Sequence, residues 1–197
     1  MQDLGIDALV APGHKGLYGP MGTGVLMVAA DLPVKTWREG GTGVHSERAE
    51  HATEYPWRLE GDTCNVPGIA GLRGGIRFVT SVGVTAIGEH EAMLARVAVE
   101  GLRRIDGVQV LRGPEGPHTG VVSFTIDGVD PALAATMLDE SAGIAVRSGL
   151  HCAPAAHRAV DTFPAGTVRA SFGRFNTREH AEALVSAVRE IARTARP

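Results

Sequence analysis

The feature that most constrains this chain is a glycine-rich segment, residues 12–24, that lies between two short apolar runs. Glycine occupies positions 13, 16, 19, 22 and 24, and one lysine, Lys15, lies among them. The apolar runs 6–10 and 25–29 have the length and composition of buried strands. So many glycines indicate a backbone that turns sharply, adopts positive φ or lies close to a bound group. We therefore expect a tight loop at a strand end that presents Lys15.

The lysine at position 15 is informative because the chain carries almost all of its positive charge on arginine. Lys15 and Lys35 are the only lysines among 19 basic residues. An amine can lose its proton and act as a nucleophile, whereas a guanidinium cannot. Lys15 is therefore a candidate for Schiff-base formation with a carbonyl cofactor. The alternative is an ordinary lysine in a surface loop.

Composition excludes several classes of protein. The 197 residues are 44% hydrophobic and 21% charged, which is typical of a globular chain of one large or two small domains. A net charge of −3 without a long basic run argues against nucleic-acid binding. No apolar stretch approaches the ~20 residues that span a bilayer. Without a recognisable leader, and with only two cysteines, the chain is expected to be cytoplasmic.

The order of elements predicts two structural parts. The first strands have no helix before them to cover a sheet, and parallel sheets need both faces covered, so the opening indicates the middle of a larger α/β domain. An irregular segment, residues 31–60, precedes a helix that Asn65 caps, with Ile69, Leu72 and Ile76 on its inner face. A second helix follows Gly83 and ends near residue 105.

The remainder predicts a small α+β domain with the order strand, strand, helix, strand, strand, helix. The expected strands are 108–111, 121–126, 144–147 and 167–172, and the expected helices are 131–140 and the segment after residues 176–177. We therefore expect residues 1–82 to be part of a large domain, 83–106 a linking helix and 107–197 the small domain.

A second chemical cluster lies in residues 147–157, Arg-Ser-Gly-Leu-His-Cys-Ala-Pro-Ala-Ala-His. Cys152 follows His151 and lies five residues from Arg147, a cationic neighbourhood that favours a thiolate nucleophile. The alternatives are a buried structural cysteine and a zinc site formed with His151 and His157. The adjacent His-Cys pair does not follow the usual spacing of zinc ligands, so we expect no metal. On the last strand, Arg169 is a candidate for binding a carboxylate, or a surface ion-pair partner.

In these two clusters and in the residues between them, the sequence resembles the class V aminotransferase-like family of pyridoxal-phosphate (PLP) enzymes, in its cysteine desulfurase branch. The resemblance covers essentially the whole chain. Its most specific motifs are residues 13–20, 58–65, 147–154 and 168–177, in the order the family has them. It implies an α/β fold of the fold-type I PLP-dependent transferases, here the C-terminal part of the large domain followed by the small α+β domain.

The resemblance also implies a role for individual residues. Lys15 falls on the lysine that binds PLP, with His14 before it, and Thr63 falls on the threonine that reaches the cofactor phosphate of a neighbouring subunit, which implies a homodimer. Cys152 falls on the cysteine that takes sulfur from L-cysteine as a persulfide, for delivery to a sulfur-acceptor protein. Arg169 falls on the arginine that binds the substrate carboxylate, and Arg147 on the arginine that opens the cysteine loop.

Three departures from the family pattern accompany the resemblance. Asp62 stands where a glycine is expected before Thr63, and Leu150 stands where many relatives have a histidine. The half of the family's chain that normally precedes the lysine is not in this sequence, so we expect a C-terminal fragment that is inactive alone. The alternatives are another class V enzyme, such as an aminotransferase or a selenocysteine lyase, and a non-catalytic module for dimerisation or scaffolding.

The loop from residue 148 to residue 166 has no apolar periodicity, which predicts few contacts and a mobile Cys152. We expect Cys152 to be the more reactive thiol, with Arg147 and His151 as its cationic neighbours. Cys64, just before a helix, is expected to be partly packed.

Overall fold

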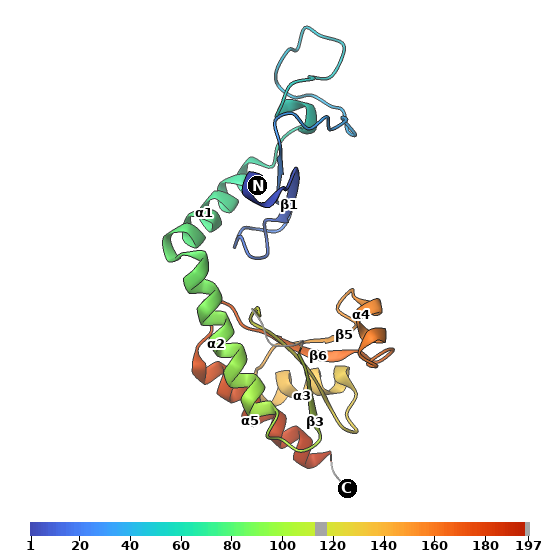
Figure 1. Ribbon diagram of the computed structural model, residues 1–197. Coiled ribbons are helices and arrows are strands. Elements are labelled where there is room, and N and C mark those ends of the chain that lie inside the picture. Colours follow the sequence, from blue (N-terminus) through green and yellow to red (C-terminus); the bar gives the residue numbers. More distant parts are fainter. Residues whose placement is uncertain (113–117, 196–197) are drawn as a thin grey trace. The chain divides into compact units, whose positions relative to one another are not determined.

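A computed structural model describes residues 1–112 and 118–195 of the chain (Figure 1). The chain divides into two compact units, Met1–Gly83 and Val84–Pro197. The sequence placed a linking helix at residues 83–106, whereas the structure groups the helix that begins at Val84 with the second unit. The predicted domain boundaries themselves remain a prediction.

The first unit contains a β-hairpin and a long helix. Its elements are η1 (Gln2–Leu4), β1 (Ala8–Pro12), β2 (Gly24–Val28), η2 (Trp57–Leu59) and α1 (Val66–Val82). The strands pair antiparallel, with Ala8 opposite Val28 and Pro12 opposite Gly24. The prediction of buried strands is wrong for this unit, since Val10 is 74% and Leu26 48% exposed. A two-stranded hairpin beside one helix cannot cover both faces of its strands.

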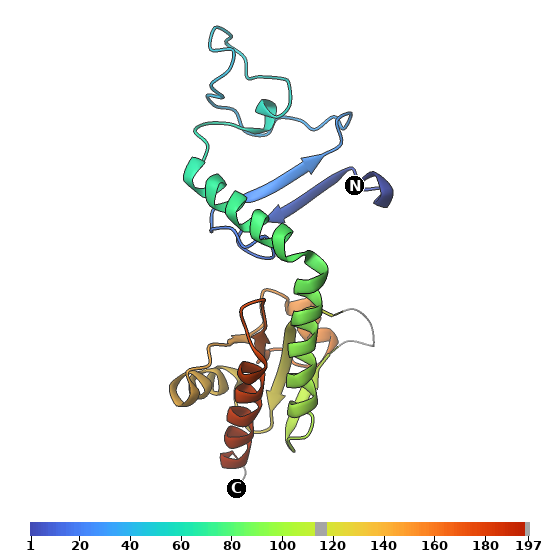
Figure 2. The same ribbon diagram turned by 90° about the vertical axis from the view of Figure 1, so that its left-hand side faces the viewer.

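Helix α1 contacts the glycine-rich loop through its own glycines, and in Figure 2 it runs alongside the hairpin. A Cβ on Gly75 would lie 2.3 Å from the Leu17 carbonyl oxygen, and one on Gly71 would lie 3.0 Å from Pro20 Cγ. The expected inner face is therefore wrong in part: Leu72 is buried, but Ile69 and Ile76 are exposed. The hydrophobic period correctly predicted a helix, but the face that packs against the loop is the one that carries glycines, because there the two backbones come into contact. The predicted cap is confirmed, because the Asn65 side chain accepts a hydrogen bond from the Gly68 N–H.

The segment between β2 and α1 is irregular apart from η2, as expected. Contacts between distant residues hold it. The Tyr55 hydroxyl donates to the Leu32 carbonyl oxygen at 2.8 Å. His45 lies between Glu54 and Glu47, with its Nδ1 3.6 Å from the Glu47 carboxylate.

The second unit is a four-stranded antiparallel sheet with helices, in the strand order β3-β4-β6-β5. Its elements are α2 (Val84–Leu102), β3 (Val108–Leu111), β4 (Val121–Ile126), α3 (Pro131–Ala142), β5 (Arg147–Gly149), α4 (Pro154–Ala159), β6 (Thr167–Ser171) and α5 (Arg178–Thr194). The predicted order of strands and helices is confirmed, and the short α4 is an addition to it.

Strand β5 begins later than predicted because the end of α3 uses the residues before it. Gly143 adopts φ 62°, and the Ile144 N–H donates to the Leu138 carbonyl oxygen at 3.1 Å. This hydrogen bond closes the helix end in the manner of a Schellman motif. Ile144 and Val146, whose apolar alternation predicted a strand, therefore pack against the core without pairing with another strand.

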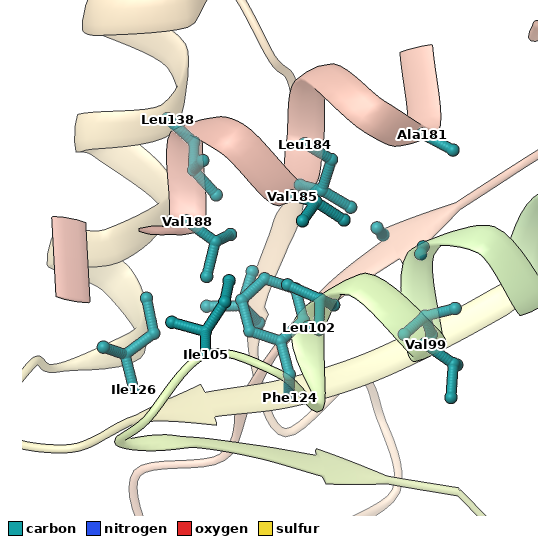
Figure 3. Close-up of a cluster of buried hydrophobic side chains, with 14 of the residues drawn as sticks. Val99, Leu102, Ile105, Phe124, Ile126, Leu138, Ala181, Leu184, Val185 and Val188 are labelled. Carbon is teal, nitrogen blue, oxygen red and sulfur yellow. The ribbon is translucent and has the colours of Figure 1, made fainter. Parts of the chain in front are cut away.

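The hydrophobic core of this unit lies between one face of the sheet and helices α2, α3 and α5 (Figure 3). Phe124 on β4 is fully buried, and so are Leu102, Leu138 and Val188, one from each helix. Burying each such side chain contributes about 1.5–3 kcal/mol. The alternate residues of the strands point to the opposite face. There the strand register aligns Ser123, Arg169 and Arg147 in one row across β4, β6 and β5.

No helix in the described part of the chain has both the length and the apolar character needed to cross a membrane.

The close approach of α1 to the loop generates a test with adjacent glycines. Gly75→Ala should destabilise the first unit by about 1–3 kcal/mol, because the new methyl group overlaps the Leu17 carbonyl. Gly74→Ala, one residue earlier, adds a methyl group with no atom within 4 Å and should stabilise the helix by ~0.5–1 kcal/mol. Urea unfolding of both variants measures the difference. Equal effects of the two substitutions would contradict the glycine contact.

Candidate active site

Lys15 lies in the connection between β1 and β2, which backbone hydrogen bonds close at its base. The Gly13 N–H donates to the Thr23 carbonyl oxygen at 2.8 Å, and the Gly19 N–H donates to the Gly13 carbonyl oxygen at 2.7 Å. A Cβ on Gly13 would lie 2.1 Å from Thr23 Oγ1, so only glycine fits there. The Tyr18 N–H donates to the Lys15 carbonyl oxygen at 3.0 Å. The lysine backbone is thus fixed while its side chain is exposed.

The other two residues assigned to the cofactor, His14 and Thr63, are also exposed and belong to the same unit. Asp62, the departure from the family's glycine, adopts φ 77°. Its carboxylate accepts a hydrogen bond from the Thr63 N–H at 2.8 Å. Aspartate tolerates the left-handed region because its side chain bonds to the nearby backbone in this way. Asp62 therefore forms a left-handed turn directly before Thr63.

Cys152 lies in a turn of unusual backbone conformation at the end of β5. Gly149, His151 and Cys152 have φ of 94°, 51° and 62°. Positive φ is uncommon for residues with a side chain, and such residues concentrate at functional sites. Cys152 is exposed and free. Cys64 is exposed too, so the expectation that it is partly packed is wrong.

Arg147 is the cation that contacts the thiol. Its Nη2 donates to Cys152 Sγ at 3.5 Å. A thiolate accepts from a guanidinium more strongly than a neutral thiol does. The five-residue spacing noted in the sequence therefore corresponds to a direct contact, made possible because the turn after β5 reverses the chain.

The loop that carries Cys152 has more contacts than predicted. Residues 154–159 form α4, and the Ala153 N–H donates to the Leu150 carbonyl oxygen at 2.8 Å. The Gly166 N–H donates to the Thr162 carbonyl oxygen at 2.7 Å. The expectation of few contacts was wrong because polar hydrogen bonds, which leave no apolar periodicity, hold the loop.

His151 is a neutral hydrogen-bonding residue rather than a cation. Its Nε2 lies 3.1 Å from Thr167 Oγ1. Burial lowers the pKa of His151 below its usual value, and the positive charge of Arg169 lowers it further. A lowered pKa argues against His151 as a cationic neighbour of Cys152, whereas Arg147 contacts the sulfur directly.

Arg169 lies on β6 opposite Arg147, on the sheet face away from the core. It lines a cavity of about 350 Å³ together with His151, Thr167 and Ser123. Its Nε is covered and has no hydrogen-bond partner among the residues described. The second unit thus brings Arg147, Cys152 and Arg169 to one region, by strand pairing and the turn after β5.

His157 is 7% exposed, and its Nδ1 lies 2.7 Å from Thr162 Oγ1. Across residues 1–112 and 118–195, no group of three or more His, Cys, Asp or Glu side chains is placed to hold a metal ion. Sequence reasoning missed the partners of the two histidines, Thr162 and Thr167. The only signal was the pair of threonines, one in the expected loop and one at the start of the expected strand 167–172, and the sequence does not show which threonine hydroxyls are buried.

Comparison with known proteins gives relatives along the whole chain. The probable cysteine desulfurase of Methanothermobacter thermautotrophicus is 36% identical over 194 residues, which are 96% of this chain and 48% of the relative. The cysteine desulfurase of Salmonella agona is 37% identical over 198 residues, which are 98% of this chain and 47% of the relative. The chain therefore spans about half the length of these relatives.

Solved structures agree on the fold. The cysteine desulfurase CsdA of Escherichia coli, in its S-sulfonic acid form, has a TM-score of 0.83 at 32% identity, over 98% of this chain and 47% of its own. The apo cysteine desulfurase of Thermococcus onnurineus has a TM-score of 0.80 at 33% identity, over 98% of this chain and 48% of its own. The predicted α/β fold is confirmed by these neighbours. The aminotransferase class-V model matches residues 1–184, and the chain belongs to that family.

Proposed function

We propose that this chain is the part of a PLP-dependent cysteine desulfurase that carries the cofactor lysine and the sulfur-accepting cysteine. The enzyme converts L-cysteine to L-alanine and retains the sulfur as a persulfide on Cys152. The observation that carries the proposal is the contact of Arg147 Nη2 with the exposed Cys152 sulfur, within a class V chain whose named relatives are cysteine desulfurases.

The residues of the first unit fit PLP. Lys15 offers an exposed amine on a fixed backbone, which suits a covalent bond to an aldehyde. His14 lies beside the lysine, and Thr63 offers an exposed hydroxyl for the phosphate of a second copy's cofactor. When bound, PLP supplies an electron sink for chemistry at the α-carbon of an amino acid. In this chain Lys15 also moves the proton at that carbon once its amine is free.

The second unit supplies the sulfur chemistry. The Cys152 thiolate attacks the sulfur of the substrate cysteine, so a sulfur–sulfur bond forms as the bond between sulfur and Cβ breaks. The electron pair of the broken bond leaves with the carbon fragment, where a proton completes the methyl group of alanine. Arg147 stabilises the attacking thiolate through its guanidinium contact. Arg169 binds the substrate carboxylate.

Partners and location follow from the same proposal. A persulfide on an exposed cysteine is accessible to a sulfur-acceptor protein. Thr63 reaches the cofactor of a second copy, so the enzyme is a homodimer. Two free cysteines are compatible with the reducing cytoplasm, which we propose as its location.

The role of Lys15 has a matched control in the only other lysine, Lys35, which is also exposed. We expect the 197-residue chain, incubated with PLP and reduced with borohydride, to carry the cofactor on Lys15 and not on Lys35. Lys15→Ala should abolish the visible absorbance of the bound cofactor, and Lys35→Ala should leave it unchanged. Equal labelling of both lysines, or no absorbance of a bound cofactor, as a non-catalytic module would give, refutes the assignment.

The role of Cys152 is tested against Cys64 in the enzyme that contains this chain. Cys152→Ala should reduce alanine release from L-cysteine by at least about 100-fold, since removing a nucleophile removes the step it performs. Cys64→Ala should retain the wild-type rate. Undiminished alanine release from the Cys152 variant, or activity confined to transamination or to selenocysteine, would assign another class V reaction.

A further inference from the structure

The turn that presents Cys152 is held in a conformation that its own residues disfavour. His151 and Cys152 both carry side chains and both adopt left-handed φ, 51° and 62°. Such residues persist where the surrounding structure determines their conformation. The contact that Cys152 makes with Arg147 therefore depends on the interactions that keep this turn in its left-handed conformation.

The side chain of His151 joins the turn to the sheet. Its Nε2 lies 3.1 Å from Thr167 Oγ1, and Thr167, at the start of β6, is 1% exposed. A hydroxyl so deeply buried needs a hydrogen-bond partner, and His151 is one. Next to Thr167 the two strands approach closely, since a Cβ on Gly166 would lie 2.2 Å from the backbone of Gly149 and Gly149 pairs with Thr167.

A second histidine supports the first. The rings of His151 and His157 have centroids 5.6 Å apart, and the buried His157 is fixed by Thr162 Oγ1 at 2.7 Å. The charged groups that act on His151 are Arg169, Arg147 and, when protonated, His157, all of which disfavour a second positive charge. His151 is thereby kept as a neutral hydrogen-bonding partner.

We propose that His151 and Thr167 are positioning residues, whose mutual hydrogen bond holds the left-handed turn and so keeps the Cys152 sulfur against Arg147. Neither residue needs to touch the substrate for this role. A benefit for sulfur transfer rests on the proposed function, whereas the effect on the reactivity of the Cys152 thiol does not.

The test compares the rates at which iodoacetamide labels Cys152 and Cys64 in the 197-residue chain, from neutral to alkaline pH. Thr167→Val removes the hydroxyl and keeps the shape of the side chain. It should lower the Cys152 to Cys64 rate ratio at neutral pH by roughly two- to tenfold, the lower part of the range for a coupling between contacting residues. Thr167→Ser should restore the ratio. Thr136→Val, on the exposed side of α3, should leave it unchanged.

A double-mutant cycle separates positioning from a merely structural role. If Thr167 acts by holding Cys152 at Arg147, Thr167→Val should have no further effect on the pH profile once Arg147→Gln is present. Should Thr167→Val not fold, His151→Asn breaks the same bond from the half-buried partner. An unchanged rate ratio, or an equal change with and without Arg147, overturns the proposal. Because labelling needs neither PLP nor substrate, these results stand apart from any failure of cofactor binding at Lys15.

Discussion

The first unit depends on a contact between backbones, the approach of the loop at residues 13–20 to helix α1. Gly75 and Gly71 face this loop, and a methyl group on Gly75 would lie 2.3 Å from the Leu17 carbonyl oxygen, too close to fit. Side chains of ordinary size would hold the loop away from the helix and leave its closely spaced hydrogen bonds without support. The absence of side chains on one helix face therefore fixes where Lys15 lies relative to α1, while the amine itself remains exposed.

The second unit holds its reactive residue by a different kind of interaction. One face of its sheet is apolar and packs against three helices, which makes the sheet a rigid base. The other face carries Arg169 and Thr167, alternate residues of the same strand. Because successive side chains of a strand point to opposite faces, the strands that bury apolar residues in the core also hold polar side chains at defined positions on the other face. The turn with Cys152 attaches to this face through the contact of His151 with Thr167, so the sheet determines the geometry of the site.

Periodicity and capping signals predicted most elements, and their failures have physical causes. The Asn65 cap, the order of elements after residue 107 and the start of a helix at Pro131 could be predicted, because each depends on neighbours in sequence. The exposure of Ile69 could not be predicted, since the choice of helix face depends on how closely another backbone approaches. The contact of Arg147 with Cys152 was anticipated from spacing alone. The hydrogen bonds of His151 and His157 join residues 5 to 16 positions apart through a turn whose left-handed backbone no pattern predicts.

The distribution of charge around Cys152 explains why the turn uses both arginine and histidine. Arginine stays protonated at every physiological pH, so the cation that faces the sulfur does not change its charge. Histidine would change its charge between about pH 5 and pH 8, but burial and Arg169 lower the pKa of His151. A base whose pKa is lowered by folding stabilises the fold above its unfolded pKa of ~6.5, and this contribution is lost as the pH falls through the lowered value. At neutral pH the turn therefore combines a permanent positive charge at the sulfur with a neutral hydrogen bond that holds the backbone. Exchanging the two residue types would make the charge at the sulfur depend on pH and would place a permanent charge at the half-buried anchor position.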